Sequence, residues 1–255
     1  MCDCCGCDEG FQEICIQKPG EISSSVHTHT HQGREPHGRQ RTIQVEKNIL
    51  AKNNAIAADN RQSFIENSIF ALNLVSSPGA GKTTLLEKSI NRLEGTPLAV
   101  IEGDQQTTRD AERIEATGAE VVQVNTGTGC HLDAEMVRLA AQKLTLQKHS
   151  LLFIENVGNL VCPAMFDLGE AHKVVIISVT EGDDKPQKYP HMFAAAEICI
   201  INKIDLLPYV NFDVSKCREY AQHVNSGLIF FEVSATTGEG IAPWLNWLQQ
   251  NLNTR

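Results

Sequence analysis

Four cysteines stand within the first seven residues of the chain, in the string MCDCCGC. Clustered thiolates suit a borderline-soft metal ion, and three or four of them can form a square-planar site for Ni²⁺. A redox pair is one alternative, although a redox C-x-x-C motif begins a helix inside a folded unit. A structural zinc knuckle is another, but it usually needs a second pair of ligands at a fixed distance. The string therefore favours a metal site.

Four histidines follow in the segment SSSVHTHTHQGREPH, at His27, His29, His31 and His37. Neutral imidazoles at this density can hold a metal ion. A solvated linker that contains histidines would look the same. The sequence leaves both interpretations open.

A phosphate-binding loop is predicted in SSPGAGKTTLLEKSINRL, where an apolar run leads into a turn and then a helical pattern. In such a loop the backbone N–H groups surround phosphate oxygens, the lysine reaches the β and γ phosphates, and the threonine hydroxyl binds Mg²⁺. Ser76 stands where the generic pattern has glycine. The residues expected to contact the phosphates or Mg²⁺ are Gly79, Ala80, Gly81, Lys82, Thr83 and Thr84.

The string INKID places Asn202, Lys203 and Asp205 directly after a predicted buried strand. The Asp205 carboxylate can accept hydrogen bonds from both N1–H and the exocyclic amine of guanine, whereas adenine offers no such pair of donors. Ser234 and Ala235, in VSAT, are expected to present backbone N–H groups to the guanine O6. The sequence therefore predicts GTP rather than ATP as the nucleotide.

Two segments between these motifs are predicted to act in GTP hydrolysis. Asp104 ends the strand in IEGDQQTTRD and is a candidate for holding Mg²⁺ or its water, with a helix N-cap as the alternative role. Glu155 and Gly158, in LLFIENVGNL, stand where many GTPases place an acidic Mg²⁺ partner and a glycine whose N–H meets the γ phosphate. We expect Lys82, Asp104 and Glu155 to be the catalytic residues.

Cys130 and His131 are adjacent at a strand-to-helix turn, and Cys162 follows Gly158 by four residues. Two thiolates and an imidazole suit Zn²⁺ or Ni²⁺, and both segments are expected at the same sheet edge as the nucleotide. Buried cysteines and a capping histidine would be the structural alternative. If Cys162 moves when the γ phosphate leaves, metal affinity becomes a function of nucleotide state.

Seven apolar runs, separated by amphipathic segments, must position these residues. Near-continuous apolar strands alternating with helices predict an α/β fold with a doubly wound, mostly parallel sheet and a binding site at the carboxyl ends of its strands. Residues 42–67 show a helical pattern, with Asn60 as an expected break. We expect a flexible Cys/His-containing arm over residues 1–40, a helical preface over 41–67 and a P-loop domain over 68–255. The predicted strands are FALNLVS, PLAVIEG, AEVVQVN, SLLFIEN, KVVIISVT, EICIINK and GLIFFEVSA.

Composition excludes several classes of function. The 22 Lys and Arg residues against 31 Asp and Glu leave a net charge of −9, with no basic run to bind nucleic acid. No apolar stretch approaches the roughly 20 residues needed to span a bilayer, and the N-terminus lacks a signal-peptide pattern, so we expect a cytoplasmic protein that binds no membrane. Thiols stay reduced in that compartment, and Cys199, within the apolar run ICII, is expected to pack in the core.

These motifs together resemble the HypB family, the nickel-inserting GTPases of hydrogenase maturation. The resemblance rests on Cys-x-x-Cys-Gly-Cys at the N-terminus and on NLVSSPGAGKTTLL, EGDQ, GTGCHLDAEMV, IENVGNLVCP and NKID. Ser76 fits this family, whereas Cys4 is additional to the terminal motif and its role stays open. One alternative client is urease, but urease GTPases usually carry Cys-Pro-His at their metal site. A metal buffer with a vestigial nucleotide site is a further alternative.

The resemblance implies a GTPase domain that forms a homodimer on GTP binding, with metal bound by Cys130, His131 and Cys162 near the dimer interface. It also implies Ni²⁺ at Cys2, Cys5 and Cys7, whereas Zn²⁺ is an alternative ion that thiolate and imidazole ligands suit. The implied partners are a HypA-like zinc-containing accessory protein and the precursor of the hydrogenase large subunit. The expected function is therefore nickel delivery coupled to GTP hydrolysis.

Overall fold

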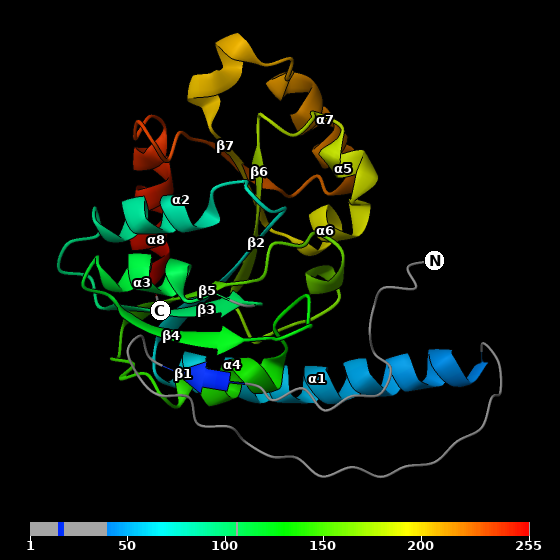
Figure 1. The fold of residues 1–255 in the computed structure, drawn as a ribbon, viewed down its shortest axis with the longest axis vertical. Helices are drawn as coiled ribbons and strands as arrows, with labels where there is room; N and C mark the ends of the chain where they lie inside the picture. Colours follow the sequence, from blue (N-terminus) through cyan, green and yellow to red (C-terminus); the bar gives the residue numbers. More distant parts are fainter. Residues whose placement is uncertain (1–14, 18–39, 106, 255) are drawn as a thin grey trace.

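The computed structural model describes residues 15–17, 40–105 and 107–254, which form a central sheet covered by helices (Figure 1). The expectations for the N-terminal cysteines and histidines stay predictions, because these residues lie outside the described ranges. They are Cys2, Cys4, Cys5, Cys7, His27, His29, His31 and His37.

The sheet has eight strands in the order β1-β4-β3-β5-β2-β6-β7-β8. All neighbouring strands are parallel except β1 and β4, which pair antiparallel. Strand β2, which leads into the predicted phosphate-binding loop, lies inside the sheet, between β5 and β6. The strands are β1 (Cys15–Gln17), β2 (Ile69–Ser76), β3 (Leu98–Asp104), β4 (Glu120–Asn125), β5 (Ser150–Glu155), β6 (His172–Ser178), β7 (Ile198–Asn202) and β8 (Ile229–Glu232).

The seven strands predicted from apolar runs are β2 to β8, and their parallel pairing confirms the predicted fold class. Most of their residues are buried, as expected for a sheet covered on both faces. Strand β1 was not predicted. It pairs with the outer edge of β4 and consists of only three residues, Cys15–Gln17. A strand of this length is too short to show a hydrophobic pattern in the sequence.

Helices cover both faces of the sheet. On one face α2, α3 and α8 pack over a core that includes Leu72, Leu85 and Trp244. On the other face α1 and α4 cover the half of the sheet near β3, and α6 and α7 cover the half near β7. The helices are α1 (Gln40–Glu66), α2 (Lys82–Ile90), α3 (Arg109–Glu115), α4 (Ala134–Ala141), α5 (Lys185–Lys188), α6 (Pro190–Ala195), α7 (Val214–Val224) and α8 (Ile241–Asn253), with short 3₁₀ turns η1 (Cys162–Ala164) and η2 (Ile204–Tyr209).

The predicted helical preface is helix α1, but the expected break at Asn60 is wrong. The helix continues to Glu66 because Asn60 lies on its buried stripe, with Asn53, Ala57 and Phe64. Nδ2 of Asn60 donates to the carbonyls of Ala134 and Leu168, at 2.8 and 3.0 Å, so its amide serves packing instead of ending the helix. None of the helices among the described residues is long and apolar enough to cross a membrane.

Core packing of Cys199, predicted from the sequence, is confirmed. Its side chain is fully buried in the cluster beneath α6 and α7, and burial raises the pKa of its thiol. Cys217, on α7, is buried in the same cluster. Neither thiol belongs to the group of predicted metal ligands, which follow the carboxyl ends of β4 and β5.

Candidate nucleotide and metal sites

The turn between β2 and α2 has the shape of a phosphate-binding loop. Gly79 and Gly81 take φ values of 76° and 91°, in the left-handed region that favours glycine. A Cβ atom on Gly81 would lie 2.6 Å from Nδ2 of Asn202, so this close approach also requires glycine. The same Nδ2 donates to the carbonyl of Ala80 at 2.9 Å. The asparagine of the guanine motif therefore fixes the loop in place.

Lys82 begins helix α2, as predicted for the lysine that contacts phosphates. Its Nζ donates to Oγ of Ser76 at 3.1 Å and lies 3.9 Å from Oε1 of Glu155. Ser76, which departs from the generic motif, thus supplies a hydroxyl that holds the lysine at the mouth of the loop.

A cavity of about 540 Å³ opens over this loop, at the carboxyl ends of β2, β3 and β5. Besides the loop, it is lined by Asp104 and Gln105 after β3, by Glu155 and Gly158 at the end of β5, and by Lys203. The predicted phosphate and switch segments therefore meet around one cavity, at the edge where parallel sheets bind their ligands.

Buried carboxylates lie beneath the phosphate side of the cavity. Oγ1 of Thr83 donates to Oε1 of Glu155 at 2.7 Å. Oε2 of Glu155 and Oε2 of Glu102 are buried with no hydrogen-bond partner in the described part of the chain. Burial raises the pKa of Glu155, and burial together with the charges of Glu155 and Asp104 raises the pKa of Glu102 to about 9. Unmatched carboxylate oxygens beside a threonine hydroxyl fit a hard cation such as Mg²⁺.

Asp104 ends β3 and lines the cavity, but it does not cap helix α3. Its Oδ2 accepts hydrogen bonds from N and Oγ1 of Thr107, at 2.9 and 2.8 Å, and the residue that caps α3 is Thr108. The N-cap alternative for Asp104 is therefore wrong. Its carboxylate instead fixes the turn that enters α3, at the position predicted for Mg²⁺ or its water.

The guanine motif follows β7 with a strained backbone at Lys203, whose φ is 64°. Nζ of Lys203 donates to the carbonyl of Gly79 at 2.7 Å, across the phosphate loop. Oδ1 of Asp205 is buried without a hydrogen-bond partner among the described residues. A buried, unmatched carboxylate oxygen at this position is suited to receive paired N–H donors from a ligand.

Ser234 and Ala235 lie behind the asparagine of this motif. Oδ1 of Asn202 accepts from the amide of Ala235 at 3.1 Å, and the amide of Ser234 donates to the carbonyl of Glu239 at 2.9 Å. Both amides expected to meet the guanine O6 therefore donate within the protein. To contact the guanine O6, the backbone N–H of Ser234 or Ala235 would have to give up its present partner or divide its hydrogen bond between two acceptors.

The three predicted metal ligands of the domain come together. The ligand atoms of Cys130, His131 and Cys162 all lie within 4.8 Å of one another, and Sγ of Cys130 is 3.5 Å from Nδ1 of His131. The ring of His131 packs against Phe166, with centroids 4.0 Å apart. Burial lowers the pKa of His131, which favours the neutral imidazole that metals bind. This close approach of two thiols and an imidazole fits a site for a thiophilic metal ion. It fits less well with the alternative, in which the cysteines only pack in the core and His131 only caps a helix.

The segment after β5 connects the two sites. Glu155 contacts the phosphate loop through Thr83, and Gly158 lies so close to Pro78 that an added Cβ would be 3.2 Å from its Cα. One residue later, Nδ2 of Asn159 donates to the carbonyl of Cys130 at 3.4 Å. A single short segment therefore touches the nucleotide loop and ends at a metal ligand.

Two further residues of the nucleotide site were missed in the sequence. Arg113, on α3, lines the cavity and donates to Oγ1 of Thr84 and Oε2 of Glu87, at 3.1 and 2.6 Å. Glu102 faces the same carboxylate cluster from β3, in register with Glu155. Its signal was a charged residue inside the apolar run PLAVIEG.

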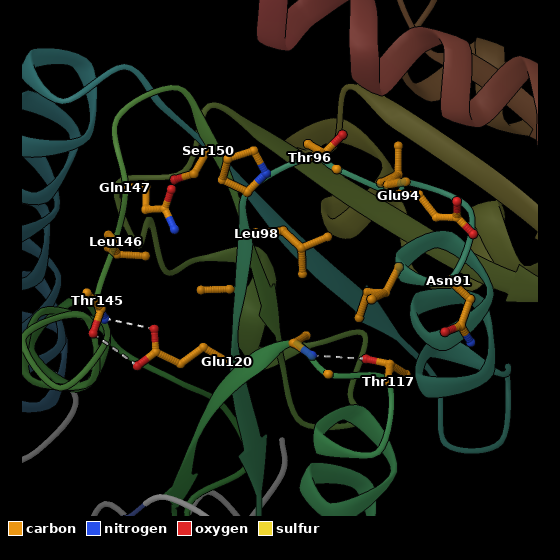
Figure 2. A pocket seen from close by; sticks show the side chains of 17 residues that line it. Asn91, Glu94, Thr96, Leu98, Thr117, Glu120, Thr145, Leu146, Gln147 and Ser150 are labelled. Atoms are coloured by element: carbon orange, nitrogen blue, oxygen red, sulfur yellow. Dashed lines mark hydrogen bonds between the residues drawn. The ribbon is translucent and has the colours of Figure 1, made fainter.

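A second cavity, of about 560 Å³, lies at the opposite edge, around the amino ends of β3, β4 and β5. Figure 2 shows Glu120 there, where its carboxylate accepts from N and Oγ1 of Thr145 at 2.9 and 3.4 Å. None of the predicted site residues in the described ranges lines this cavity. Although the two cavities have similar volumes, the phosphate, switch and guanine residues gather at the carboxyl edge only.

Comparisons with known proteins agree with this arrangement. The CobW/HypB/UreG nucleotide-binding domain family matches residues 70–232. The hydrogenase maturation factor HypB of Escherichia coli K12 is 59% identical over 212 residues, covering 83% of this chain and 73% of the relative. That of Azotobacter vinelandii is 49% identical, covering 100% of this chain and 94% of the relative.

Solved structures show the same likeness. The crystal structure of HypB from Helicobacter pylori in complex with nickel has a TM-score of 0.76 at 39% identity, covering 80% of this chain and 96% of that one. HypB from Archaeoglobus fulgidus gives 0.74 at 38% identity, covering 79% and 99%. The chain therefore belongs to the CobW/HypB/UreG nucleotide-binding family and, within it, to the HypB hydrogenase maturation factors.

Proposed function

We propose that this protein is a GTP-hydrolysing nickel metallochaperone, which helps insert Ni²⁺ into the precursor of a hydrogenase large subunit. The observation that carries the proposal is the segment from Glu155 to Cys162. It begins at a hydrogen bond to the phosphate loop and ends at a ligand of the cysteine and histidine cluster. Hydrolysis at one end would thereby change metal binding at the other.

The reaction is the transfer of the γ phosphoryl group of GTP to water. Lys82 neutralises charge on the β and γ phosphates, and the backbone N–H of Gly158 donates to the γ phosphate. An attacking water forms a bond to the γ phosphorus as the bond to the bridging oxygen breaks and GDP leaves. Mg²⁺, when bound, supplies further charge neutralisation, and Thr83, Asp104 and Glu155 would hold it. The unmatched Oε2 of Glu155 supports this assignment.

Selectivity for guanine follows from Asp205. Its buried Oδ1 has no partner in the described part of the chain, so a base without paired N–H donors leaves the carboxylate unsatisfied. Lys203 extends over the phosphate loop, where its aliphatic stem can lie along the base. Asn202 holds the two halves of the site together.

Nickel is the cargo. Cys130, His131 and Cys162 form a site within the domain, for which Zn²⁺ is the competing ion, since both metals accept thiolate and imidazole ligands. The H. pylori relative was crystallised in complex with nickel, which favours Ni²⁺. We further propose that residues 1–40 are a metal-binding arm in which Cys2, Cys5 and Cys7 hold a second Ni²⁺, attached through a helical preface to the GTPase domain of residues 68–255.

We propose that GTP binding closes a homodimer, as the resemblance to the HypB family implies. The fourth ligand of the metal site would come from water, from a neighbouring residue or from the second copy. A HypA-like accessory protein and the hydrogenase precursor would be the partners, acting in the cytoplasm, where thiols stay reduced. The names of the relatives support the hydrogenase as client.

Phosphate release from GTP tests the proposal. The full chain should hydrolyse GTP, and Lys82→Ala should abolish turnover because the main cation at the transferred phosphate is lost. Lys148→Ala is the matched control. Lys148 is exposed near the opposite sheet edge, so its replacement should leave GTP turnover unchanged. Hydrolysis by Lys82→Ala at the wild-type rate would overturn the assignment of the site, and a wild-type chain without turnover would favour the metal-buffer alternative.

A further inference from the structure

A chain of buried polar side chains runs behind the phosphate-binding strand, on the sheet face opposite α2. Asn73, in β2, and Lys173, in β6, are register partners on adjacent strands. Asn156 and Glu170 extend the chain on either side of Asn73. All four side chains are at most 7% exposed, at 0% for Asn73, 1% for Asn156, 7% for Glu170 and 6% for Lys173.

The links are continuous. Nδ2 of Asn156 donates to Oδ1 of Asn73 at 3.3 Å, and Nδ2 of Asn73 donates to Oε1 of Glu170 at 3.0 Å. Nζ of Lys173 lies 3.6 Å from the same carboxylate oxygen. Burying four polar side chains inside a sheet core is costly unless each is matched, so these residues must keep their mutual geometry.

Each end of the chain holds a segment that carries a metal ligand. At one end, Oδ1 of Asn156 accepts from the amide of Leu132, the residue after His131, at 3.0 Å. At the other end, Nζ of Lys173 donates to the carbonyls of Pro163 and Phe166, at 2.9 and 3.1 Å. Pro163 follows Cys162 directly, and the Phe166 ring packs on His131. The chain therefore spans the two halves of the metal cluster.

The backbone of Asn156 belongs to the nucleotide switch. It follows Glu155, which contacts Thr83, and precedes Gly158, which lies against Pro78 of the phosphate loop. A displacement of this segment would move the side-chain amide of Asn156, which accepts the hydrogen bond from Leu132. Through Asn73 and Glu170 it would also change the position of Lys173. We infer that Asn156, Asn73, Glu170 and Lys173 form a positioning relay that converts the state of the nucleotide switch into the spacing of Cys130, His131 and Cys162.

This inference rests on the proposed function, because it names the residues through which nucleotide state reaches the metal. None of the four relay residues lines the nucleotide cavity, and none is among the metal ligands. Their role is to position backbone that carries the ligands. Their replacement should therefore change the coupling between the sites while GTP turnover continues.

The test uses the full chain with Cys2, Cys4, Cys5 and Cys7 replaced by serine, which removes the terminal thiolates. The histidines of the arm are present in both nucleotide states, so a difference in nickel affinity between the states reports on the domain site. Ni²⁺ affinity is measured by titration in the presence of GDP and of a non-hydrolysable GTP analogue. We expect the two dissociation constants to differ by about tenfold, within the usual range of coupling between sites. Equal constants in this parent chain would overturn the proposed function, and the relay with it.

Asn73→Asp then breaks the relay by placing a second carboxylate against Glu170. The ratio of the two dissociation constants should fall to within about twofold of unity, with GTP turnover unchanged. Adding Glu170→Gln reverses the direction of that hydrogen bond, since the new amide can donate to the new carboxylate, and should restore the ratio. Asn225→Asp is the control, because the side-chain amide of Asn225 also donates hydrogen bonds, to the carbonyls of Phe193 and Ala196, but the residue lies at the end of α7 and outside the relay. A folded Asn73→Asp variant that keeps the parent ratio would overturn the relay and leave the proposed function intact.

A wild-type measurement covers the case in which Asn73→Asp does not fold. The side-chain amide resonances of Asn156 and Asn73 in nuclear magnetic resonance spectra should shift when GDP is exchanged for the GTP analogue, because their hydrogen-bond lengths change. Resonances that stay in place while the amide of Gly158 shifts would show that the switch moves without the relay, and would overturn the inference.

Discussion

Oγ1 of Thr83 donates a 2.7 Å hydrogen bond to Oε1 of Glu155, and this bond joins the first turn of α2 to the end of β5. Glu155 is 3% exposed and lines the cavity beside the phosphate-binding loop, so its carboxylate is shielded from bulk solvent. The chain that leaves Glu155 reaches Cys162 after one short loop. One short segment thus connects the phosphate-binding loop to the cysteine and histidine cluster, and the proposed coupling of nucleotide and metal rests on it.

Replacing Glu155 by Gln tests the acidic partner of the phosphate loop. The substitution keeps the size of the side chain and the acceptor for Thr83 but removes the negative charge. We expect kcat for GTP to fall by about 10²-fold, the usual loss when one electrostatic element of a site is removed. The Mg²⁺ concentration for half-maximal turnover should rise. Glu94→Gln, at the opposite sheet edge, is the control, and a Glu155→Gln variant with unchanged turnover and Mg²⁺ dependence would exclude the assigned role.

Asp205→Asn should change which base the protein accepts. The asparagine presents a donor where the carboxylate presented an acceptor, so guanine loses its partner and xanthine, with an oxygen at that position, gains one. Competition between GTP and xanthosine triphosphate in the hydrolysis assay should reverse in favour of the latter. If GTP is still preferred, guanine is recognised by other residues.

His131→Ala and Cys162→Ser should each remove nickel binding from the domain site, in the chain whose N-terminal cysteines are replaced by serine. Each substitution takes away one of three ligands whose donor atoms lie within 4.8 Å of one another. Equilibrium dialysis should show loss of about one Ni²⁺ per chain. Cys217→Ala, which removes a buried thiol on α7, should leave that stoichiometry intact. Full nickel binding by both ligand variants would place the metal elsewhere.

Helix α1 should contribute a pH-dependent part of the stability through Asp167. Burial alone would raise the pKa of this carboxyl, but the hydrogen bonds from Arg61 and the amide of Gly169 hold it below its usual value. A lowered pKa gives stability that is present at neutral pH and lost as pH falls through the folded pKa. Because both side chains of the pair are more than a third exposed, the contribution is about 1 kcal/mol or less.

Thermal unfolding of Asp167→Asn measures this contribution. The asparagine keeps an acceptor for Gly169 and loses the charge that pairs with Arg61. The midpoint should fall by about 2–4 °C or less at pH 7, and the difference from wild type should shrink as pH falls through the lowered pKa of Asp167. A difference that is constant over this range would assign the effect to packing and not to charge.

The strands and the phosphate loop could be predicted because their signals are local. Near-continuous apolar runs indicate buried parallel strands, and Gly81, Lys82 and Thr83 have few alternative uses after such a strand. Asn60 was misread for the opposite reason. An asparagine in a helical pattern favours a helix end only if its amide faces water, and here the amide bonds to backbone brought in from α4 and from the loop before β6.

The four-residue spacing of Gly158 and Cys162 indicated that the two sites lie close together. The side-chain contacts that connect them could not be predicted, because they join residues distant in sequence. Asn73 and Lys173 appear as isolated polar residues in apolar strands, and only the parallel register of β2 and β6 makes them partners. The paired burial of Glu102 and Glu155 likewise follows from the register of β3 and β5. Sequence indicated which residues could bind metal or nucleotide, whereas the fold determines which of them lie together.

The most direct test of the central claim is the nickel affinity of the domain site in its two nucleotide states. The full chain with its four N-terminal cysteines replaced by serine is loaded with GDP or with a non-hydrolysable GTP analogue and titrated with Ni²⁺. The shared segment from Glu155 to Cys162 predicts dissociation constants that differ by about tenfold. Identical constants in the two states would contradict the claim, because nucleotide and metal would then bind independently on one chain.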